Sequence, residues 1–238
     1  MISEEIRARE ETCRTVVRWM TAGYAAFGMA LMIIHAYRKD WYLAVHSAGT
    51  LAALAAFFGA MRLMRIRPVY SLYVMIVPFM FGSYTLGVAC ALYKTVPGYD
   101  KLMHMLSGTL TMMLALPLFY ALKAGHRVER RDCLLAAVFC AAVSMAVAGI
   151  WELAEYALSL VTDLDPQCAL ETGVKDTMKD MIVCAAGALA GLPSLVRFYK
   201  NGHGGLLYSP AEAFAALNFP ENEGEKEGYQ GEKGEAGV

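Results

Sequence analysis

The sequence predicts an all-α protein, a polytopic membrane bundle of six transmembrane helices with both termini in the cytoplasm. Hydrophobic residues make up 57% of the chain, charged residues only 18%, and the mean hydropathy is +0.40. Soluble domains rarely have such a composition. The apolar residues fall into six blocks of about 18 to 25 residues, the length that a helix needs to cross a bilayer. Lys and Arg gather in alternate connections, as they do in chains that cross a membrane repeatedly.

The first three predicted spans are bounded by charged or turn-forming residues. The first begins at Trp19, and the segment 38–40 (Arg-Lys-Asp) separates it from the second, which begins at Trp41. Tryptophan is enriched where helices enter a membrane, so both positions suit a helix end. The third span contains Pro78 and two glycines, which predict a kink. These spans are Trp19–Tyr37, Trp41–Met61 and Val69–Leu92.

The last three predicted spans are separated in the same way. A Pro-Gly pair at 97–98 precedes the fourth, a basic segment over 127–132 precedes the fifth, and a longer polar segment over 162–176 precedes the sixth. Most connections are short, so consecutive helices should lie antiparallel and adjacent. These spans are Leu102–Leu122, Leu134–Leu158 and Met178–Val196.

The distribution of Lys and Arg predicts the orientation. With the distal Lys226 and Lys233 set aside, thirteen positive residues flank the helix ends on the side of the two termini, and six flank the other ends. Positive residues stay on the cytoplasmic side. We therefore expect a cytoplasmic N-terminal segment over 1–18, a membrane domain over 19–198, and a disordered cytoplasmic tail over 199–238 whose Glu-, Gly- and Lys-rich end is too polar to form a core. A short interfacial segment is expected near 211–217.

Net charge and cysteine spacing exclude several kinds of site. The formal net charge is only −1, so bulk electrostatics do not indicate a nucleic acid or another polyanion as partner. The six cysteines show no CxxC spacing and several lie in apolar runs, which is typical of small core residues and not of zinc ligands. The expected partner is the lipid bilayer, and the sequence does not indicate an oligomeric state.

Stripes of polar and small residues run along the last three spans. With 3.6 residues per turn, residues three or four positions apart share a helix face. Small residues on such a face let a neighbouring helix approach closely. The three stripes are Asp100, His104, Ser107, Gly108 and Thr111 on the fourth span; Ser144, Ala148, Glu152, Glu155 and Ser159 on the fifth; and Asp176, Asp180, Cys184, Gly187 and Gly191 on the sixth.

The antiparallel order brings the ionisable residues of these stripes to one end of the bundle. The fourth span runs inward, the fifth returns and the sixth runs inward again, so these residues fall near the outer surface. Five carboxylates this close must be protonated, paired with Lys101, Lys175 or Lys179, or neutralised by a bound cation. Ionisable groups at membrane depth are costly and usually functional. The candidate metal ligands are Asp100, His104, Glu152, Glu155, Asp176 and Asp180, and the deeper Glu152 and Asp180 are the candidate catalytic residues.

Structural roles compete with these assignments. Asp100 and Asp176 lie at helix N-termini, where a carboxylate caps free N–H groups and suits the helix dipole. A single histidine on a helix is more often a packing residue than a ligand, although a position one turn from Asp100 favours a ligand or proton carrier for His104. His35 and His46 also fall near the outer ends of their spans, and either could join the site.

At these residues the chain resembles the YjdF-like family of small multi-pass bacterial membrane proteins, and more distantly the VanZ-like family. The matching pieces cover about the last half of the membrane domain: Asp100-Lys101-x-x-His104 with Ser107-Gly108, Trp151-Glu152-x-x-Glu155-Tyr156, and Asp176-Thr177-x-x-Asp180-Met181 followed by Gly187 and Gly191. VanZ-like proteins tend to show Asn four residues after the last Asp, where this chain has Cys184. The resemblance implies a cell-membrane location and, through VanZ, a link to glycopeptide resistance, but no reaction.

Three functions remain open from the sequence. In the first, the outward-facing carboxylate and histidine cluster binds Mg²⁺, Mn²⁺ or Zn²⁺ and acts on a lipid or cell-envelope precursor head group. Metal-assisted hydrolysis is then the expected reaction class, because no nucleophile is evident. In the second, the same carboxylates relay protons or cations in a coupled transporter, although no internal repeat is found. In the third, the charged helix ends only hold a membrane scaffold together.

Overall fold

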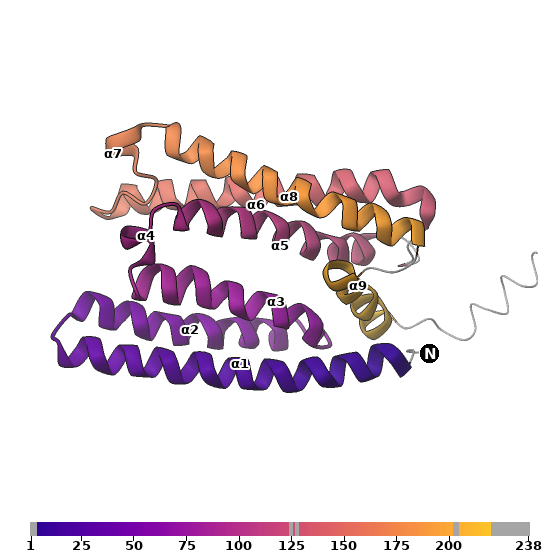
Figure 1. Cartoon of the computed structure of the whole chain (residues 1–238), viewed down its shortest axis with the longest axis horizontal. Helices are drawn as coiled ribbons and strands as arrows, with labels where there is room; N and C mark the ends of the chain where they lie inside the picture. The colour runs from indigo at the N-terminus through magenta and orange to yellow at the C-terminus, as the bar shows by residue number, and fades with distance from the viewer. Residues whose placement is uncertain (1–3, 124–125, 127–128, 202–204, 220–238) are drawn as a thin grey trace, which may run out of the picture.

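The computed structural model of the chain describes residues 4–123, 126, 129–201 and 205–219, and over these residues it contains helices and no strand. Six helical segments are long and apolar enough to cross a membrane, which confirms the predicted number of spans. The helices of these segments are α1 (Glu4–Tyr37), α2 (Trp41–Leu63), α3 (Tyr70–Met80) continued by the π-helix η1 (Phe81–Ala89), α5 (Tyr99–Leu122), α6 (Cys133–Val161) and α8 (Lys175–Asn201). Consecutive spans run antiparallel, as Figure 1 shows.

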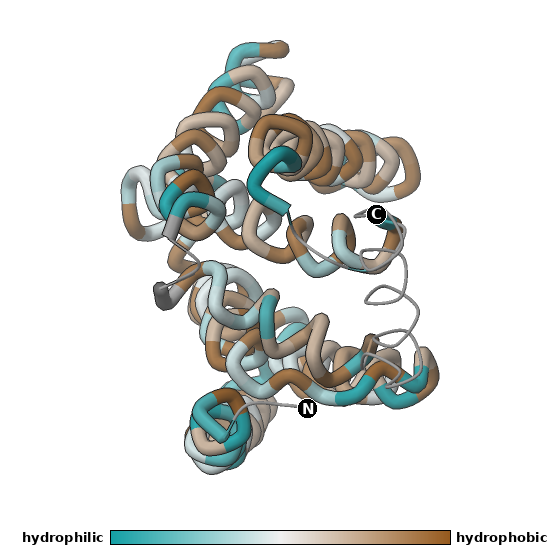
Figure 2. Tube along the Cα trace, turned by 90° about the vertical axis from the view of Figure 1, so that its right-hand side faces the viewer, coloured by the Kyte–Doolittle hydropathy of each residue, from teal (hydrophilic) through white to brown (hydrophobic). Residues whose placement is uncertain are grey.

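The six spans form two layers of three. The helices α1, α2 and α3 with η1 pack against one another, and α5, α6 and α8 form a second group with α5 in contact with both of its partners. Figure 2 looks along the bundle and shows hydrophobic residues on the outward-facing sides of many turns. Buried apolar side chains from both layers meet along α5, where Met112, Met113 and Leu116 are fully enclosed.

The short helices mark the two ends of the bundle. At one end lie α4 (Leu92–Thr95), α7 (Ala169–Thr172) and the turn between α1 and α2, and we call this end the α4/α7 end. At the opposite end lie the start of α1, the single-turn helix η3 (Arg130–Asp132) and α9 (Gly205–Asn218). That the α4/α7 end faces away from the cytoplasm stays a prediction from the distribution of Lys and Arg.

The third span shows how its proline is accommodated. Pro78 lies near the end of α3 and has no N–H to donate, and the chain then continues as the nine-residue π-helix η1. Wide turns of this kind are rare and are often found at functional sites. The sequence predicted a kink at this position, and the structure shows a change of helix type.

The first helix begins much earlier than the predicted span. The sequence placed a separate segment over 1–18, whereas α1 already begins at Glu4. Its early turns pack against the bundle because Val17 is buried and because the Glu10 carboxylate accepts hydrogen bonds from the backbone N–H and the hydroxyl of Ser71. Glu10 thus serves the first turn of α3, whose preceding residue Val69 provides no side-chain cap.

The chain after residue 199 was expected to be disordered, but part of it is helical in the structure. Here α8 extends to Asn201, and α9 packs against α5, α8 and α3. The physical reason is apolar burial, because Tyr208, Ala211 and Ala213 on α9 are enclosed by the bundle. The helix α9 covers the segment expected near 211–217, whose interfacial position stays a prediction, and residues 220–238 lie outside the described residues.

Candidate functional site

The site is built on a close approach of α5 and α8. A Cβ added at Gly108 would lie 2.1 Å from the carbonyl oxygen of Cys184, and one at Gly187 would lie 2.0 Å from that of Met105. Only glycine leaves room for backbones this close. The Thr109 hydroxyl also donates to the carbonyl of Gly187 at 2.8 Å. These contacts fix the two helices along a common register and place their first turns side by side at the α4/α7 end.

Lys101 lies at the centre of the acidic cluster. Its Nζ is 2.9 Å from Asp100 Oδ2, 2.6 Å from Asp176 Oδ1 and 2.7 Å from Asp180 Oδ1. The contact with Asp180 has an ion-pair distance without the geometry of a hydrogen bond. Three carboxylates share one ammonium group, so two negative charges remain when His104 is neutral. Of the three lysines expected to pair with the cluster, Lys175 and Lys179 form no ion pair with any described residue.

His104 joins the cluster from one turn deeper on α5. Its Nε2 lies 3.4 Å from Asp100 Oδ1 and 3.8 Å from Asp180 Oδ1. One ligand atom each from Asp100, His104 and Asp180 lies within 4.8 Å of the other two, a spacing that can hold a metal ion. Asp176 is held by Lys101 on the outer side of this group. The predicted cluster of α5 and α8 residues is therefore assembled in the structure.

The two glutamates of α6 occupy different surroundings. Ala136, Cys140, Ser144, Ala148 and Glu152 form the buried stripe of α6, so Glu152 faces α5 and α8. Gln167, from the α6–α7 connection, donates to Glu152 Oε2 at 3.1 Å and to the carbonyl of Glu152 at 3.0 Å. Glu155 instead accepts a hydrogen bond of 2.8 Å from the indole of the exposed Trp151. It remains within electrostatic range of Glu152, His104 and Asp100.

Two buried carboxylate oxygens lack a hydrogen-bond donor among the described residues. They are Oε1 of Glu152, a residue only 7% exposed, and Oδ1 of Asp180, which is 4% exposed. Buried polar atoms normally have a partner, because an unsatisfied one costs about 1–3 kcal/mol and more when it is charged. Asp180 Oδ1 already has the Lys101 ammonium group 2.7 Å away, whereas Glu152 Oε1 has no partner among the described residues, and a bound cation would supply one.

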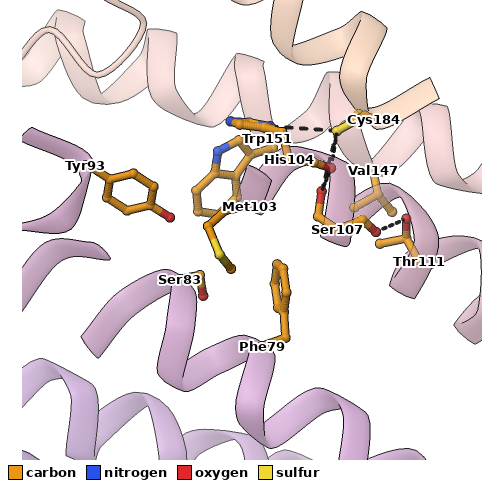
Figure 3. A pocket seen from close by; sticks show the side chains of 11 residues that line it. Phe79, Ser83, Tyr93, Met103, His104, Ser107, Thr111, Val147, Trp151 and Cys184 are labelled. Atoms are coloured by element: carbon orange, nitrogen blue, oxygen red, sulfur yellow. Dashed lines mark hydrogen bonds between the residues drawn. The ribbon is translucent and has the colours of Figure 1, made fainter. Parts of the chain in front are cut away.

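A cavity of about 200 Å³ lies next to the cluster, between the two layers. Figure 3 shows Tyr93, Met103 and Trp151 on one part of its wall and Phe79 and Ser83 facing them. His104, Ser107 and Cys184 line the part nearest the cluster, so one side chain, His104, belongs to both. The lining therefore combines apolar surface with hydroxyl groups, an imidazole and a thiol.

Tyr93 is brought to the cavity by α4. The left-handed backbone of Ala91 (φ 58°) and of Gly98 (φ 78°) flanks this single turn. The Tyr93 ring packs on Gly87, where an added Cβ would lie 2.2 Å from a ring carbon. Desolvation, and then the Asp100 carboxylate, raises the pKa of Tyr93, so its hydroxyl stays protonated and can donate a hydrogen bond.

The cavity ends on an apolar floor. The last polar group of α5 in its lining is Thr111, whose hydroxyl oxygen lies 2.9 Å from that of Ser144 behind the wall, and both hydroxyls also bond to backbone carbonyls of α5. The next turns toward the opposite end present Met112, Leu116 and Leu195, which are fully buried. Along α5 the buried side chains between Thr111 and Tyr120 are apolar, and the buried Tyr208 hydroxyl of α9 bonds to the carbonyl of Gly191 on α8.

Some parts of this site could not be read from helix faces. Lys101 follows Asp100 in the sequence, so a helical wheel places it on a different face of α5 from Asp100 and His104. Its long side chain nevertheless reaches the Asp176 and Asp180 carboxylates of α8. Gln167 comes from an irregular connection, for which the sequence carries no periodic signal. His35 and His46 stay outside the cluster. They belong to the layer of α1, α2 and α3, where His46 Nδ1 lies 3.4 Å from the hydroxyl of Tyr84 on η1.

Comparison with known families supports the membrane assignment. A family model described as a predicted membrane protein (DUF2238) matches residues 16–201, a range that begins inside α1 and ends with α8. No curated protein and no solved structure matches the chain. The resemblance to YjdF-like and VanZ-like proteins stays a prediction from the motifs.

Proposed function

The chain belongs to DUF2238, a family of predicted membrane proteins, and on that premise we propose that it binds a divalent cation and, through it, the anionic head group of a membrane amphiphile. The observation that carries the proposal is the group of Asp100, His104 and Asp180 ligand atoms within 4.8 Å of one another, together with the buried Oε1 of Glu152, which has no donor among the described residues. The count of positive residues supports an outward-facing site, open to lipid or cell-envelope precursors.

The donor set suits Mg²⁺, Mn²⁺ or Zn²⁺. Carboxylate oxygens are the preferred ligands of Mg²⁺ and Mn²⁺, and one imidazole extends the choice to Zn²⁺. Lys101 contacts Oδ2 of Asp100 and leaves Oδ1 turned toward His104. In the proposed site Asp176 is an outer partner, and Lys101 holds Asp100 Oδ2 while its ammonium group competes with the cation for Asp180 Oδ1. Glu152 and Glu155 complete the negative surroundings.

The cavity suits the first part of a hydrocarbon chain. Its apolar side chains, among them Phe79, Met103 and Trp151, lie between the layers and adjoin the cluster at His104. The same lining offers a head group hydrogen-bond donors, among them the protonated Tyr93 hydroxyl and the Ser83 hydroxyl. This arrangement of an apolar seat with a few convergent polar groups is typical of ligand sites.

The reaction class we propose is hydrolysis of a phosphate ester. The oxygen of a water molecule forms the new bond to phosphorus, the ester P–O bond breaks, and the alcohol leaves with a proton from solvent. Glu152 is the proposed base, because its Oε1 is free to take the proton of the water, and Asp180 holds the cation. A Lewis-acidic cation would supply the charge stabilisation of the phosphoryl oxygens.

The structure favours this function over a coupled transporter. A relay needs a polar path across the membrane, whereas Met112, Leu116 and Leu195 fill the interior beyond Thr111 and Ser144. A scaffold in turn gives no reason for the buried Oε1 of Glu152, which has no donor among the described residues, since buried polar atoms normally have a partner.

Trp151 allows the head-group part of the proposal to be tested by fluorescence. The purified protein in a nonionic detergent is titrated with dodecyl phosphate, with Mg²⁺ or with EDTA. Trp151 lines the cavity, so we expect a saturable change of emission that requires Mg²⁺ and is lost in Trp151→Phe. Asp180→Asn should abolish it, while Glu171→Gln, an exposed acid on α7 at the same end, should not.

Three results would reject the proposal. They are an unchanged response in Asp180→Asn, equal binding with EDTA, and equal binding of dodecyl maltoside, which has the same chain without an anionic group. Release of inorganic phosphate from dodecyl phosphate, lost in Glu152→Gln with cation binding retained, tests the hydrolytic step separately.

A further inference from the structure

The cavity beside the cluster is bordered by two spans that make no extended contact with each other. Val147, Ala148 and Trp151 of α6 form one border, and Phe79 and Ser83 of the third span form the other, as Figure 3 shows in part. The helix α6 packs on α5 and α8, whereas α3 and η1 pack on α1, α2 and α5. The two borders are therefore joined through α5, which forms the inner wall of the cavity.

Exposed side chains in the lining indicate where the cavity opens. Val147 is 42% exposed and Trp151 is 57% exposed, although both line the cavity. On the inner walls, by contrast, Met103 of α5 is 6% exposed and Cys184 of α8 is 1% exposed. The remaining exposed lining residue, Tyr93, belongs to α4 at the head-group end. The cavity therefore has a side opening along α6, toward the third span.

This side opening lies at the depth of the hydrocarbon core. Val147 is the middle residue of α6, and Phe79 lies at the middle of the span Tyr70–Ala89. The centre of a spanning helix lies near the centre of a hydrocarbon layer about 30 Å thick. Outside the opening there are consequently lipid chains and no water. The cluster lies farther along the bundle, toward the α4/α7 end.

The cavity is too small to enclose a whole lipid. Its volume of about 200 Å³ is below the ~300–1,000 Å³ of sites that enclose drug-sized ligands. A ligand whose head group lies at the cluster would therefore have only the first part of its chain inside. The rest of a long chain would leave through the side opening and remain among the lipids.

We infer that the site takes its ligand sideways from the bilayer, through the side opening that Val147 and Phe79 flank. The ligand class is a long-chain alkyl or acyl phosphate that stays anchored in the membrane, with its head group at the cluster and the end of its chain among the lipids. Val147 and Phe79 are the residues that limit the thickness of the chain. The inference rests on the proposed function for the chemistry of the head group alone.

Photolabelling tests whether a long chain passes through the opening. Full-length protein in phosphatidylcholine vesicles receives hexyl or hexadecyl phosphate with a diazirine near the head group, in Mg²⁺ or in EDTA, and tandem mass spectrometry identifies the labelled residues. We expect both probes to label the buried Met103 in Mg²⁺. Val147→Phe narrows the opening, so labelling of Met103 by hexadecyl phosphate should fall about tenfold, and labelling by the short hexyl phosphate should fall much less.

Ile150→Phe is the matched control, because Ile150 is exposed on the same helix and does not line the cavity, and it should leave the labelling of Met103 unchanged. Labelling of Met103 by hexyl but not by hexadecyl phosphate, or equal hexadecyl labelling in wild type and Val147→Phe, would overturn the inference and leave the proposed function standing. Equal labelling in Mg²⁺ and EDTA would reject the proposed cation and leave the side opening as inferred. An unlabelled Met103 with both probes would overturn both.

Discussion

Replacing Gly187 by alanine tests whether the α5–α8 contact assembles the site. The new Cβ would lie 2.0 Å from the carbonyl oxygen of Met105, whereas real Cβ atoms essentially never lie closer than 3.0 Å to a neighbour. The obstacle is backbone and cannot rotate away, so the helices must separate by about 1 Å. The acidic cluster lies two turns away along the same pair of helices and should open with them.

The size of the effect follows from the ion-pair distances. A separation of about 1 Å would lengthen the contacts of Lys101 with Asp176 and Asp180 from 2.6 and 2.7 Å to about 3.6 Å, beyond hydrogen-bonding range. Overpacking of this kind costs about 1–3 kcal/mol of folding free energy. Because ligands displaced by about 1 Å no longer fit one ion, we expect cation affinity to fall at least about tenfold.

The assay is thermal unfolding in detergent, with and without saturating Mg²⁺. We expect Gly187→Ala to lower the unfolding temperature by several degrees and to lose most of the stabilisation that Mg²⁺ gives the wild type. Gly149→Ala is the matched control, because nothing lies within 4 Å of a Cβ at Gly149 on α6. Wild-type stability and wild-type response to Mg²⁺ in Gly187→Ala would refute the reasoning.

Three further predictions concern other parts of the chain. Lys101→Met should lower the unfolding free energy by about 2 kcal/mol, which is less than the ~3–5 kcal/mol of a fully buried pair because the lysine side chain is 28% exposed. Saturating Mg²⁺ should stabilise this variant more than it stabilises the wild type, and an equal stabilisation of both proteins would contradict the prediction. Desolvation and then the Asp176 carboxylate raise the pKa of Cys168, so its thiol is mostly protonated at pH 7. An impermeant maleimide added outside intact cells should label Cys168 slowly at pH 7 and faster as the pH rises. Labelling that occurs only from the cytoplasmic side would contradict this prediction. Glu10→Ala should cost about 1–3 kcal/mol in thermal unfolding, since it removes the acceptor of two buried Ser71 bonds, and an unchanged unfolding temperature would disprove that role.

Hydropathy was enough to predict the six spans, because crossing a bilayer imposes a length and an apolar composition on each segment. It failed where stability comes from tertiary contacts. The sequence at the start of α1 is polar, yet this part of the helix packs on the bundle through the buried Val17 and through the hydrogen bonds that Glu10 accepts from Ser71. The helix α9 likewise depends on the burial of Tyr208 when α9 packs against α5 and α8, and the local sequence pattern does not predict this contact.

The candidate site was predictable to the extent that helix periodicity governs it. Asp100 and His104 share a face of α5 as expected, and Gly187 allows the approach of the helix that carries Asp180. The central place of Lys101 depends on the path of a long flexible side chain, which periodicity does not determine. The contact of Cys184 with His104 depends on the register between two helices, and that register is set by glycine contacts visible only in three dimensions.

The most direct measurement is the amount of divalent metal bound per chain. Purified protein is dialysed against Mn²⁺ and then against metal-free buffer, and its manganese content is determined by elemental analysis beside that of Asp180→Asn. We predict about one ion per chain in the wild type and essentially none in the variant, which should still insert and remain folded. Equal manganese in both proteins, or none in the wild type, would contradict the proposal that Asp100, His104 and Asp180 form a cation site.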